Sequence, residues 1–434
     1  MTYPPYPLYK PSGVAWLGDV PTGWEVKALR YLFQNLDYKR IPVAAKDRAD
    51  MDKIYPYYGA SGVIDYVESY IFSETLILVA EDGANLLSRS TPLAFIASGY
   101  YWVNNHAHIL KPIMGDIRFW MCVLQSFDYS PLVTGAAQPK LTADNLGTVK
   151  LPVPPIKEQL SIADFLDRQT ARIDTLIAKR RALIEKLKEK RSALISRTVT
   201  RGLPPAAALA AGLDPYPPLK PSGVEWLGDV PVGWEVKRLK YSASVNDESL
   251  PETTDPSFEF SYVDISSVDP VAGIVNTEEM VFEDAPSRAR RIVREGDTIV
   301  STVRTYLRAI APIRACKSKL IVSTGFAVIR PRTVDPDFLS YALQESGFVD
   351  TIVARSVGVS YPAVNASEIA TISIPLPSPF EQRAIANFLD RQTAKIDRMV
   401  SLEEAVIARM QEYRSALITA AVTGKIDVRG GAEA

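Results

Sequence analysis

Apolar residues recur at alternating steps of four and three positions along two long stretches of the chain. In the first stretch the positions are Ile162, Leu166, Gln169, Ile173, Leu176, Arg180, Leu183, Leu187, Lys190 and Leu194. In the second stretch they are Ile385, Leu389, Gln392, Ile396, Met399, Glu403, Val406, Met410, Tyr413 and Leu417. This heptad spacing predicts two long helices, over residues 155–200 and 378–423. A helix of some 40 residues would run about 60 Å.

A helix of that length with a single apolar stripe needs a partner, and the matching register makes each helix the partner of the other. Pairing about a pseudo-twofold axis predicts an antiparallel coiled coil within the chain. Under that symmetry Arg180 should lie near its repeat equivalent Glu403, and the two opposite charges would penalise slipped registers. The alternative is that both charges point to water.

The chain also repeats its own sequence. Residues 10–31 read KPSGVAWLGDVPTGWEVKALRY, and residues 220–241 read KPSGVEWLGDVPVGWEVKRLKY, shifted by 210 positions. Residues 152–200 match residues 375–423 without a gap, shifted by 223 positions. Two alike frames therefore hold two unlike blocks, as expected for a scaffold that presents two variable modules at a set distance.

Each unlike block has short apolar runs between turn signals, which predict strands. The expected strands are residues 75–80, 93–98 and 109–113 in the first block, and residues 299–303, 309–313 and 325–329 in the second. The fold class is therefore α/β or α+β, with two such modules joined by the long helices. An aromatic loop with glycines is expected at residues 55–62, and both blocks close on a Gly-containing turn ending in Pro139 or Pro362.

Charge is uneven along the chain although the 434 residues carry a net charge of only −1. Residues 281–332 hold eleven Lys or Arg against four Asp or Glu, a basic patch suited to nucleic acid. Residues 31–150 hold ten basic and twelve acidic residues, so any DNA contact there depends on local placement. Cys122 and Cys316 form no disulfide or zinc pattern and are expected to be buried thiols.

No apolar run approaches the roughly 18 residues that span a bilayer, and the opening MTYPPYPLYK lacks the apolar core of a signal peptide. We therefore expect a cytoplasmic protein without a membrane partner.

Three enzymatic or metal-binding alternatives were weighed. Asp19, Glu25 and Lys27 resemble the carboxylate spacing of a metal-dependent nuclease, but the motif is duplicated with its flanking tryptophans, which favours a framework role. The Pro-Pro-Tyr run at residues 4–6 resembles a methyltransferase loop but lacks a Gly-rich cofactor loop. His106 and His108 share a strand face, yet further zinc ligands are not clustered nearby, so no metal is predicted.

The whole pattern resembles the specificity subunit of a Type I restriction-modification system. The most specific elements are the twin closings LPVPPIKEQLSIADFLDRQTARID and SIPLPSPFEQRAIANFLDRQTAKID and the twin Trp-Leu-Gly-Asp-Val-Pro openings. The resemblance implies two target-recognition domains that each read half of a split DNA sequence. It also implies two methyltransferase subunits docked on the helices, and two motor/restriction subunits are expected.

The implied organisation has seven parts. They are an N-terminal repeat segment at 1–30, target-recognition domain 1 at 31–150, spacer helix 1 at 151–202, a linker with the second repeat segment at 203–239, target-recognition domain 2 at 240–373, spacer helix 2 at 374–425 and a tail at 426–434.

Side chains suited to base edges or phosphates supply the candidate DNA contacts. They are Tyr57, Tyr58, Ser61, Asn85, Arg89, Asn105, His106, His108, Gln138 and Lys140 in domain 1, and Arg290, Arg304, Tyr306, Arg308, Ser323, Thr324, Ser360 and Tyr361 in domain 2. The second closing has Ser360 and Tyr361 where the first has Ala137 and Gln138, so Gln138 has no glutamine counterpart in the second copy.

The expected function is non-catalytic DNA recognition. The resemblance places S-adenosylmethionine, ATP and Mg on partner subunits of a complex that is a restriction endonuclease and an adenine-N6 DNA methyltransferase. One alternative is a coiled-coil protein-protein adaptor, which salt-sensitive, sequence-selective DNA binding would exclude. The other is the nuclease at Glu25 and Glu235, which would cleave DNA alone with Mg²⁺.

Overall fold

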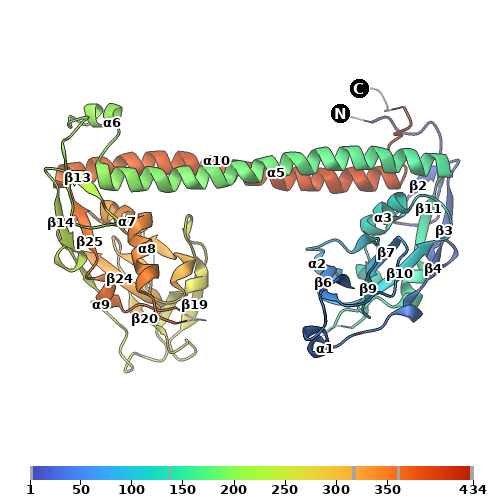
Figure 1. Cartoon of the computed structure of the whole chain (residues 1–434), viewed down its shortest axis with the longest axis horizontal. Coiled ribbons are helices and arrows are strands. Elements are labelled where there is room, and N and C mark those ends of the chain that lie inside the picture. The colour runs from blue at the N-terminus through green and yellow to red at the C-terminus, as the bar shows by residue number, and fades with distance from the viewer. Residues whose placement is uncertain (1–2, 136–137, 315–318, 359–361, 431–434) are drawn as a thin grey trace. The chain divides into compact units, whose positions relative to one another are not determined.

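The computed structural model describes residues 3–135, 138–314, 319–358 and 362–430. The chain divides into two compact units: unit 1 comprises residues 1–180 and 404–434, and unit 2 comprises residues 181–403. Two helices, α5 (Ile156–Arg201) and α10 (Pro379–Val422), each contribute one half to each unit. The prediction of two long helices is confirmed (Figure 1). Within the described part of the chain, no helix is long and apolar enough to cross a membrane.

Inside each unit the two half-helices run antiparallel. In unit 1 Arg414 of α10 forms an ion pair with Asp174 of α5 at 2.9 Å. Just after the end of α10, Gly424 approaches Trp24, whose indole N–H donates to Glu158 in the first turn of α5 at 3.0 Å. The end of α10 therefore lies beside the start of α5. In unit 2 Arg191 of α5 forms an ion pair with Asp397 of α10 at 3.0 Å. Just after the end of α5, Gly202 approaches Trp234, whose indole N–H donates to Glu381 in the first turn of α10 at 3.3 Å, so the two half-helices of unit 2 also run in opposite directions.

The predicted apolar seam of α5 is wrong at two positions after Ile173. Leu176 and Leu183 are 40% and 43% exposed, and Ile177 and Ile184 are buried in their place. The predicted seam of the second helix is also wrong at one position, since Met399 is exposed and the next residue, Val400, is buried. A helix with 3.6 residues per turn drifts about 20° per heptad from a strict 3.5-residue repeat, so a pair with little supercoil moves its buried stripe to the next residue.

The elements of unit 1 outside the long helices are mostly strands. They are β1 (Tyr9–Pro11), β2 (Asp19–Pro21), β3 (Glu25–Ala28), β4 (Phe33–Asn35), α1 (Ala45–Ala49), β5 (Tyr55–Gly59), β6 (Gly62–Val67), β7 (Leu76–Ala80), α2 (Asn85–Ser88), β8 (Ala94–Ala97), β9 (Trp102–Val103), β10 (Ala107–Pro112), α3 (Ile117–Ser126), α4 (Ala143–Thr148) and β11 (Lys150–Val153).

Unit 2 follows the same outline with more strands. Its elements are α6 (Pro205–Ala210), β12 (Leu219–Pro221), β13 (Asp229–Pro231), β14 (Glu235–Arg238), β15 (Ala243–Val245), β16 (Glu259–Val263), β17 (Val268–Asp269), β18 (Gly273–Ile274), β19 (Glu278–Val281), β20 (Ala289–Ile292), β21 (Thr298–Ser301), β22 (Ile310–Pro312), β23 (Leu320–Ser323), β24 (Phe326–Pro331), α7 (Pro336–Gln344), α8 (Ser346–Arg355), α9 (Ala366–Ile369) and β25 (Ser373–Leu376).

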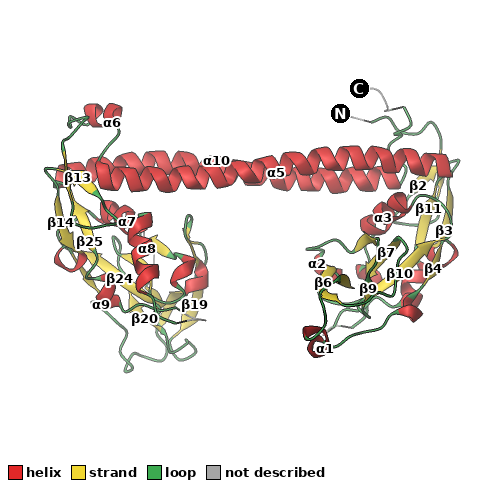
Figure 2. Cartoon of the chain, in the orientation of Figure 1, coloured by secondary structure: helices red, strands yellow, loops and turns green. Residues whose placement is uncertain are grey.

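Both units are built on one antiparallel four-stranded sheet with the same strand order, β4-β10-β7-β8 in unit 1 and β15-β24-β21-β22 in unit 2. Figure 2 shows the strands of each unit in yellow. The central strand β7 is completely buried, which explains its continuous apolar sequence LILVA. All six predicted strands are present within one or two residues. The internal repeat therefore extends into blocks whose sequences differ.

The second sheet of each unit is where the two differ. Unit 1 has the three-stranded sheet β6-β5-β9, and unit 2 has the four-stranded sheet β19-β16-β23-β20. The expected loop at residues 55–62 is wrong, because β5 and β6 form a hairpin there. Tyrosines favour strands, and Gly62 takes the positive φ of 121° that the turn requires.

A buried glutamine ties each sheet domain to its half of a long helix. The side-chain carbonyl of Gln159 accepts from the backbone N–H of Asp116 at 3.1 Å, and its amide donates to the carbonyl of Pro154 at 2.9 Å. Gln382, shifted by 223 positions, makes the same two bonds to Asp335 and Pro377. Each glutamine thereby joins the N-terminus of a domain helix, α3 or α7, to the first turn of α5 or α10.

Candidate nucleic-acid interface

One end of the main sheet of unit 1 carries three loops, which we call the edge loops of unit 1: residues 81–91, 104–106 and 134–140, of which 136 and 137 are outside the described residues. Thr134 and Lys140 exchange two backbone hydrogen bonds of 2.8 Å, which closes the third loop. The N–H of Leu141 donates to the carbonyl of Glu81 at 2.7 Å, and the N–H of Gly83 to that of Pro139 at 3.0 Å. Backbone bonds thus join the loop after β7 to the closing loop.

The edge loops of unit 2, residues 302–308, 323–325 and 357–363 without 359–361, have the same backbone pattern. Val357 and Ala363 exchange two bonds of 2.9 and 3.0 Å. The N–H of Val364 donates to the carbonyl of Thr302, and the N–H of Arg304 to that of Pro362, both at 2.8 Å. The two units therefore hold different side chains on one backbone arrangement.

Unit 1 reinforces this arrangement with charges. The buried Glu81 forms ion pairs with Arg40 and, at 3.2 Å, with Lys140 of the closing loop. Asp82 contacts the Nδ1 of His106 at 2.7 Å, which links the first edge loop to the second. Several oppositely charged groups share this small space, so each carboxylate has a partner and none is buried alone.

His108 lies beneath the loops and is 1% exposed. Its Nδ1 contacts Asp37 at 2.6 Å and its Nε2 contacts the carbonyl oxygen of Leu141 at 2.8 Å. Burial raises the pKa of Asp37, but the interactions with His108, with the N–H of Ile109 and with Asn35 together outweigh burial and leave that pKa below its ordinary value. Asp37 therefore acts as a charged anchor under the edge loops.

Asp37, Glu81 and His108 also form the one group in the described part of the chain whose ligand atoms lie close enough to hold a metal ion. Both nitrogens of His108 already face oxygen atoms, and Glu81 is engaged by two cations. The donor set is thus explained by protein contacts, and the expectation that this chain needs no metal remains a prediction.

The structure brings most candidate residues of domain 1 to the edge loops. The exposed ones are Arg89, Asn105, His106, Gln138 and Lys140, and Asn85 is half-buried. Ser61 and Tyr58 lie on the neighbouring hairpin, whose Tyr58 carbonyl accepts from the N–H of Asn104 at 3.0 Å. Tyr57 and His108 are buried, so they support the loops and do not reach a base. The DNA contacts of the exposed side chains remain predictions.

In domain 2 the exposed candidates are Arg304, Tyr306, Arg308 and Thr324. Thr324 is held beside Arg288, whose carbonyl accepts its N–H at 2.7 Å. Ser323 is buried, and Arg290 is half-buried with its guanidinium 4.6 Å from the ring centre of Phe282. Ser360 and Tyr361 lie outside the described residues. Their proposed DNA contacts remain predictions.

Arg89 and Arg308 occupy matching places in the two units. Each ends a short helical turn after the central strand and has a left-handed backbone, with φ of 49° and 52°. Non-glycine residues rarely adopt this conformation, which often marks functional loops. Arg89 donates to the carbonyl of Gln125 at 2.5 Å, and Arg308 contacts Asp350 at 2.6 Å. Both arginines are thus held at the edge while remaining exposed.

Other sequence candidates lie in framework positions. Glu25 pairs with Lys27 at 2.5 Å, and Glu235 with Lys237 at 2.5 Å, on strands β3 and β14 that pair with β11 and β25. This arrangement favours the framework interpretation over the nuclease. Cys122 is a buried free thiol, as expected, whereas Cys316 lies outside the described residues.

Arg180 and Glu403 fall in different units, so their predicted proximity stays untested.

Sequence reasoning missed the residues that position the site: Glu81, Asp37, Gln159 and Gln382. The glutamines had a signal, because a polar residue occurs at the same place in both copies, one turn into each long helix. Glu81 had none, since a carboxylate after an apolar run resembles any strand end.

Comparison with known proteins adds a family to this geometry. The family model described as "Type I restriction modification DNA specificity domain" matches twice, over residues 21–186 and 231–406. A specificity subunit of the type I restriction enzyme MjaVIII from Methanocaldococcus jannaschii is 22% identical over 94% of this chain and 94% of its own length. The EcoDI specificity subunit from Escherichia coli is 19% identical over 96% and 91%.

A further relative, from Haemophilus influenzae, is 37% identical but over only 27% of this chain and 30% of its own length. It is described as a putative type I restriction enzyme specificity subunit. A solved structure from work on complex assembly of the type I R-M system covers 94% of this chain and 99% of that one, with a TM-score of 0.57 and 15% identity. At that identity the likeness concerns the fold.

Proposed function

Because the chain belongs to the type I restriction-modification DNA specificity family, we propose that it is the subunit that reads a two-part DNA target, one half-site per unit. The observation that carries the proposal is the pair of edge-loop sets, which share backbone hydrogen bonds but present different side chains. A fixed backbone places the loops, and their side chains select the bases.

The two units are expected to read different half-sites. Both units present a guanidinium at matching places, from Arg89 and Arg308. Unit 1 adds amide, imidazole and ammonium groups from Asn105, His106 and Lys140, whereas unit 2 adds the guanidinium of Arg304 and the phenol of Tyr306. Asn side chains suit adenine and Arg side chains suit guanine in the major groove. Mismatch costs of about 1 to 3 kcal/mol add across positions, so two short half-sites together give a selective target.

The subunit is not an enzyme by itself in this proposal, as is usual for its family. Two methyltransferase subunits would supply S-adenosylmethionine chemistry for adenine-N6 methylation, and two motor/restriction subunits would supply ATP- and Mg-dependent cleavage. The long helices offer docking surfaces, since Leu176, Leu183, Met399, Leu402 and Tyr413 are large apolar side chains exposed along α5 and α10. Such exposed apolar groups on a helix suit a partner helix.

Methylation sequencing tests the proposal. The chain would be coexpressed with the methyltransferase subunit of its host in cells without other DNA methylation, and plasmid methylation would be mapped base by base. We expect one split motif, one half of which changes when the edge-loop side chains of one unit are replaced together. A formed and active complex that methylates no motif would favour the adaptor alternative, and cleavage by this chain alone with Mg²⁺ would favour the nuclease.

A further inference from the structure

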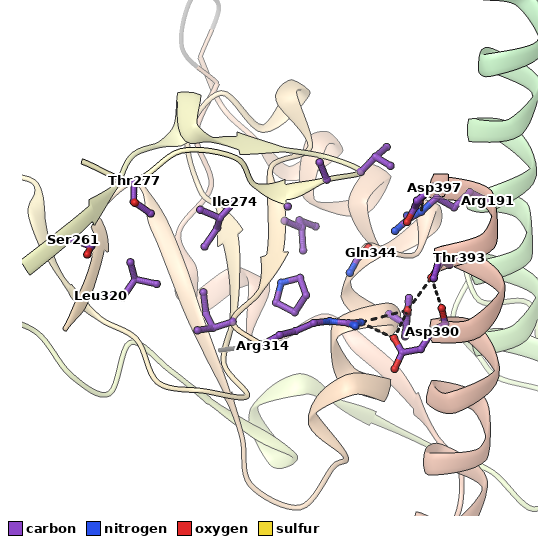
Figure 3. Close-up of a pocket in the computed structure, with 18 residues that line it drawn as sticks. Arg191, Ser261, Ile274, Thr277, Arg314, Leu320, Gln344, Asp390, Thr393 and Asp397 are labelled. Atoms are coloured by element: carbon purple, nitrogen blue, oxygen red, sulfur yellow. Dashed lines mark hydrogen bonds and ion pairs between the residues drawn. The ribbon is translucent and has the colours of Figure 1, made fainter. Parts of the chain in front are cut away.

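A hollow of about 550 Å³ lies in unit 2 between target-recognition domain 2 and α10 (Figure 3). On the domain side it is lined by Gly273, Ile274 and Pro312, and on the helix side by Thr393 and Asp397. A second hollow of about 550 Å³ lies beside it and is lined by Gly296, Pro336 and Asp337. Side chains therefore do not fill this stretch of the contact between domain and helix.

Arg314 crosses the space between the two hollows and lines both. Its guanidinium forms an ion pair of 2.6 Å with Asp390 on α10, and the hydroxyl of Tyr341 on α7 donates to the same carboxylate at 2.7 Å. Tyr341 also contacts the hydroxyl of Thr393 at 3.2 Å. Figure 3 shows Arg314 reaching Asp390 at the surface of α10, with Thr393 beside them. We call this cluster of Arg314, Tyr341, Asp390 and Thr393 the brace.

The buried apolar residues of α10 precede the brace residues along the helix. Ile385, Ala386 and Leu389 are buried in the core with Phe338 and Leu339 of α7, which attaches the domain firmly at that end of the contact. The next residue, Asp390, and Thr393 one turn further line the first hollow. Close packing fixes an angle only where atoms fill the contact, so the packed end can act as a pivot and the brace as its stop.

Unit 1 keeps the same acceptor but uses another donor. Asp167 is the repeat equivalent of Asp390, and it binds Arg118 of α3 at 2.7 Å. The same guanidinium contacts Asp164 and Asp116, at 2.9 and 2.8 Å. An arginine from a different part of the domain thus reaches the equivalent carboxylate. A contact that is rebuilt from new residues at one helix position indicates a role for the contact itself.

We propose that Arg314 and Asp390 are positioning residues that set how strictly the second recognition domain keeps its distance from the other half-site. The inference rests on the proposed function and concerns the length of the unread gap between half-sites. The ion pair of the brace is half-exposed, with Arg314 52% and Asp390 33% exposed, so the loss of this pair should loosen the angle of the domain and not unfold it.

The test uses the full subunit in its methyltransferase complex, after the target has been mapped. Substrates carry both half-sites with the native gap or with one base pair more or less. Loss of one half-exposed ion pair changes a population by roughly threefold. We therefore expect Arg314→Gln and Asp390→Asn each to raise methylation of the off-length substrates, relative to the native gap, about threefold. Arg314→Lys keeps the positive charge, and exchanging the two side chains between positions 314 and 390 keeps the opposite charges. Both variants should therefore select the native gap as the wild type does.

Arg294→Gln is the matched control, because Arg294 is 64% exposed and its ion pair with Glu248 stays inside the domain. Unchanged gap selectivity in Arg314→Gln and Asp390→Asn, or an equal change in Arg294→Gln, would contradict the positioning role proposed for the brace. So would an Arg314→Gln variant that loses methylation at every gap length while Asp390→Asn does not, because Arg314 would then bind DNA directly. A wild-type complex that methylates no split motif would instead refute the proposed function.

Discussion

Within unit 1 the guanidinium of Arg414 on α10 donates two hydrogen bonds, of 2.9 and 3.2 Å, to the carboxylate of Asp174 on α5. The same pair recurs in unit 2 as Arg191 with Asp397, each residue shifted by 223 positions and the helices exchanged. The coiled coil therefore repeats its polar contacts as well as its apolar ones.

Arg191→Gln should destabilise the protein more than Arg414→Gln. The Arg191 side chain is 12% exposed and that of Arg414 is 36% exposed, so solvent screens the first pair less. We expect about 1 to 2 kcal/mol for Arg191 and under about 0.5 kcal/mol for Arg414. Thermal unfolding of the two variants checks this. Double-mutant cycles with Asp397→Asn and Asp174→Asn serve as controls, and equal coupling energies would contradict it.

Glu158→Ala should cost about 2 kcal/mol of stability. The buried carboxylate accepts from the indole N–H of Trp24 at 3.0 Å and from the hydroxyl of Tyr6, and both donors would lose their partner. Differential scanning calorimetry would record the loss. Tyr6→Phe removes one donor and leaves the carboxylate bonded to Trp24, so it should cost less. A Glu158→Ala protein as stable as Tyr6→Phe would argue against this assignment.

Longer helices should lengthen the unread gap and leave both half-sites intact. Seven residues inserted after Ala178 in α5 and seven after the equivalent Ser401 in α10 add about 10 Å of helix, or about three base pairs. Methylation sequencing of the variant complex reads both quantities at once. Changed half-site bases would show that the helices take part in base recognition.

Single edge-loop substitutions should relax one half-site each. Asn105→Ala is expected to weaken base preference only in the half read by unit 1, and Tyr306→Ala only in the half read by unit 2, by about 1 to 3 kcal/mol at one position. Binding to substrates with every base at each position provides the measurement. Ser257→Ala, away from the edge loops, is a control. Loss spread equally over both halves would contradict independent readout.

Cys122 should resist alkylation in the folded protein. Burial raises the pKa of its thiol to about 12, and the nucleophilic thiolate is therefore scarce at pH 8. Since an unfolded thiol ionises near pH 8.5, the stability due to this burial should fall as pH rises from about 8.5 toward 12. Mass spectrometry after iodoacetamide treatment, with and without denaturant, locates the label. Fast native labelling at Cys122 would mean that the helix α3 opens readily.

The sequence predicted the parts whose residues face one environment throughout. The run LILVA is buried on both sides, and neither long helix has an internal Gly or Pro, so strand and helix were predicted correctly there. The buried stripe was misplaced at Leu176 because a heptad count assumes supercoiling that the pair of helices does not fully adopt. The hairpin at Tyr57 was missed because glycines and tyrosines occur in loops and in strands alike.

The candidate site was predicted only as a set of residue types. Asn105 and His106 are far in sequence from Asn85 and Lys140. The antiparallel pairing of β7 with β10 brings the loops of Asn85 and His106 to one edge, and the backbone bonds of the closing loop to Glu81 and Gly83 add Lys140. His108 has the same side-chain chemistry as His106 but is buried, because it lies within β10 and meets Asp37, whereas His106 precedes the strand in an exposed loop. Tertiary contacts such as that of Glu81 with Lys140 have no local signature.

The backbone bonds that pin the edge loops, such as that from the N–H of Gly83 to the carbonyl of Pro139, involve no side chain. A mutation of an exposed loop residue therefore leaves the pinning bonds in place. Selection can explore new base preferences in one unit with little risk to folding and without disturbing the other unit. Such a protein is evolvable: a lineage exposed to changing invaders can acquire a new target by a few substitutions on an unaltered frame.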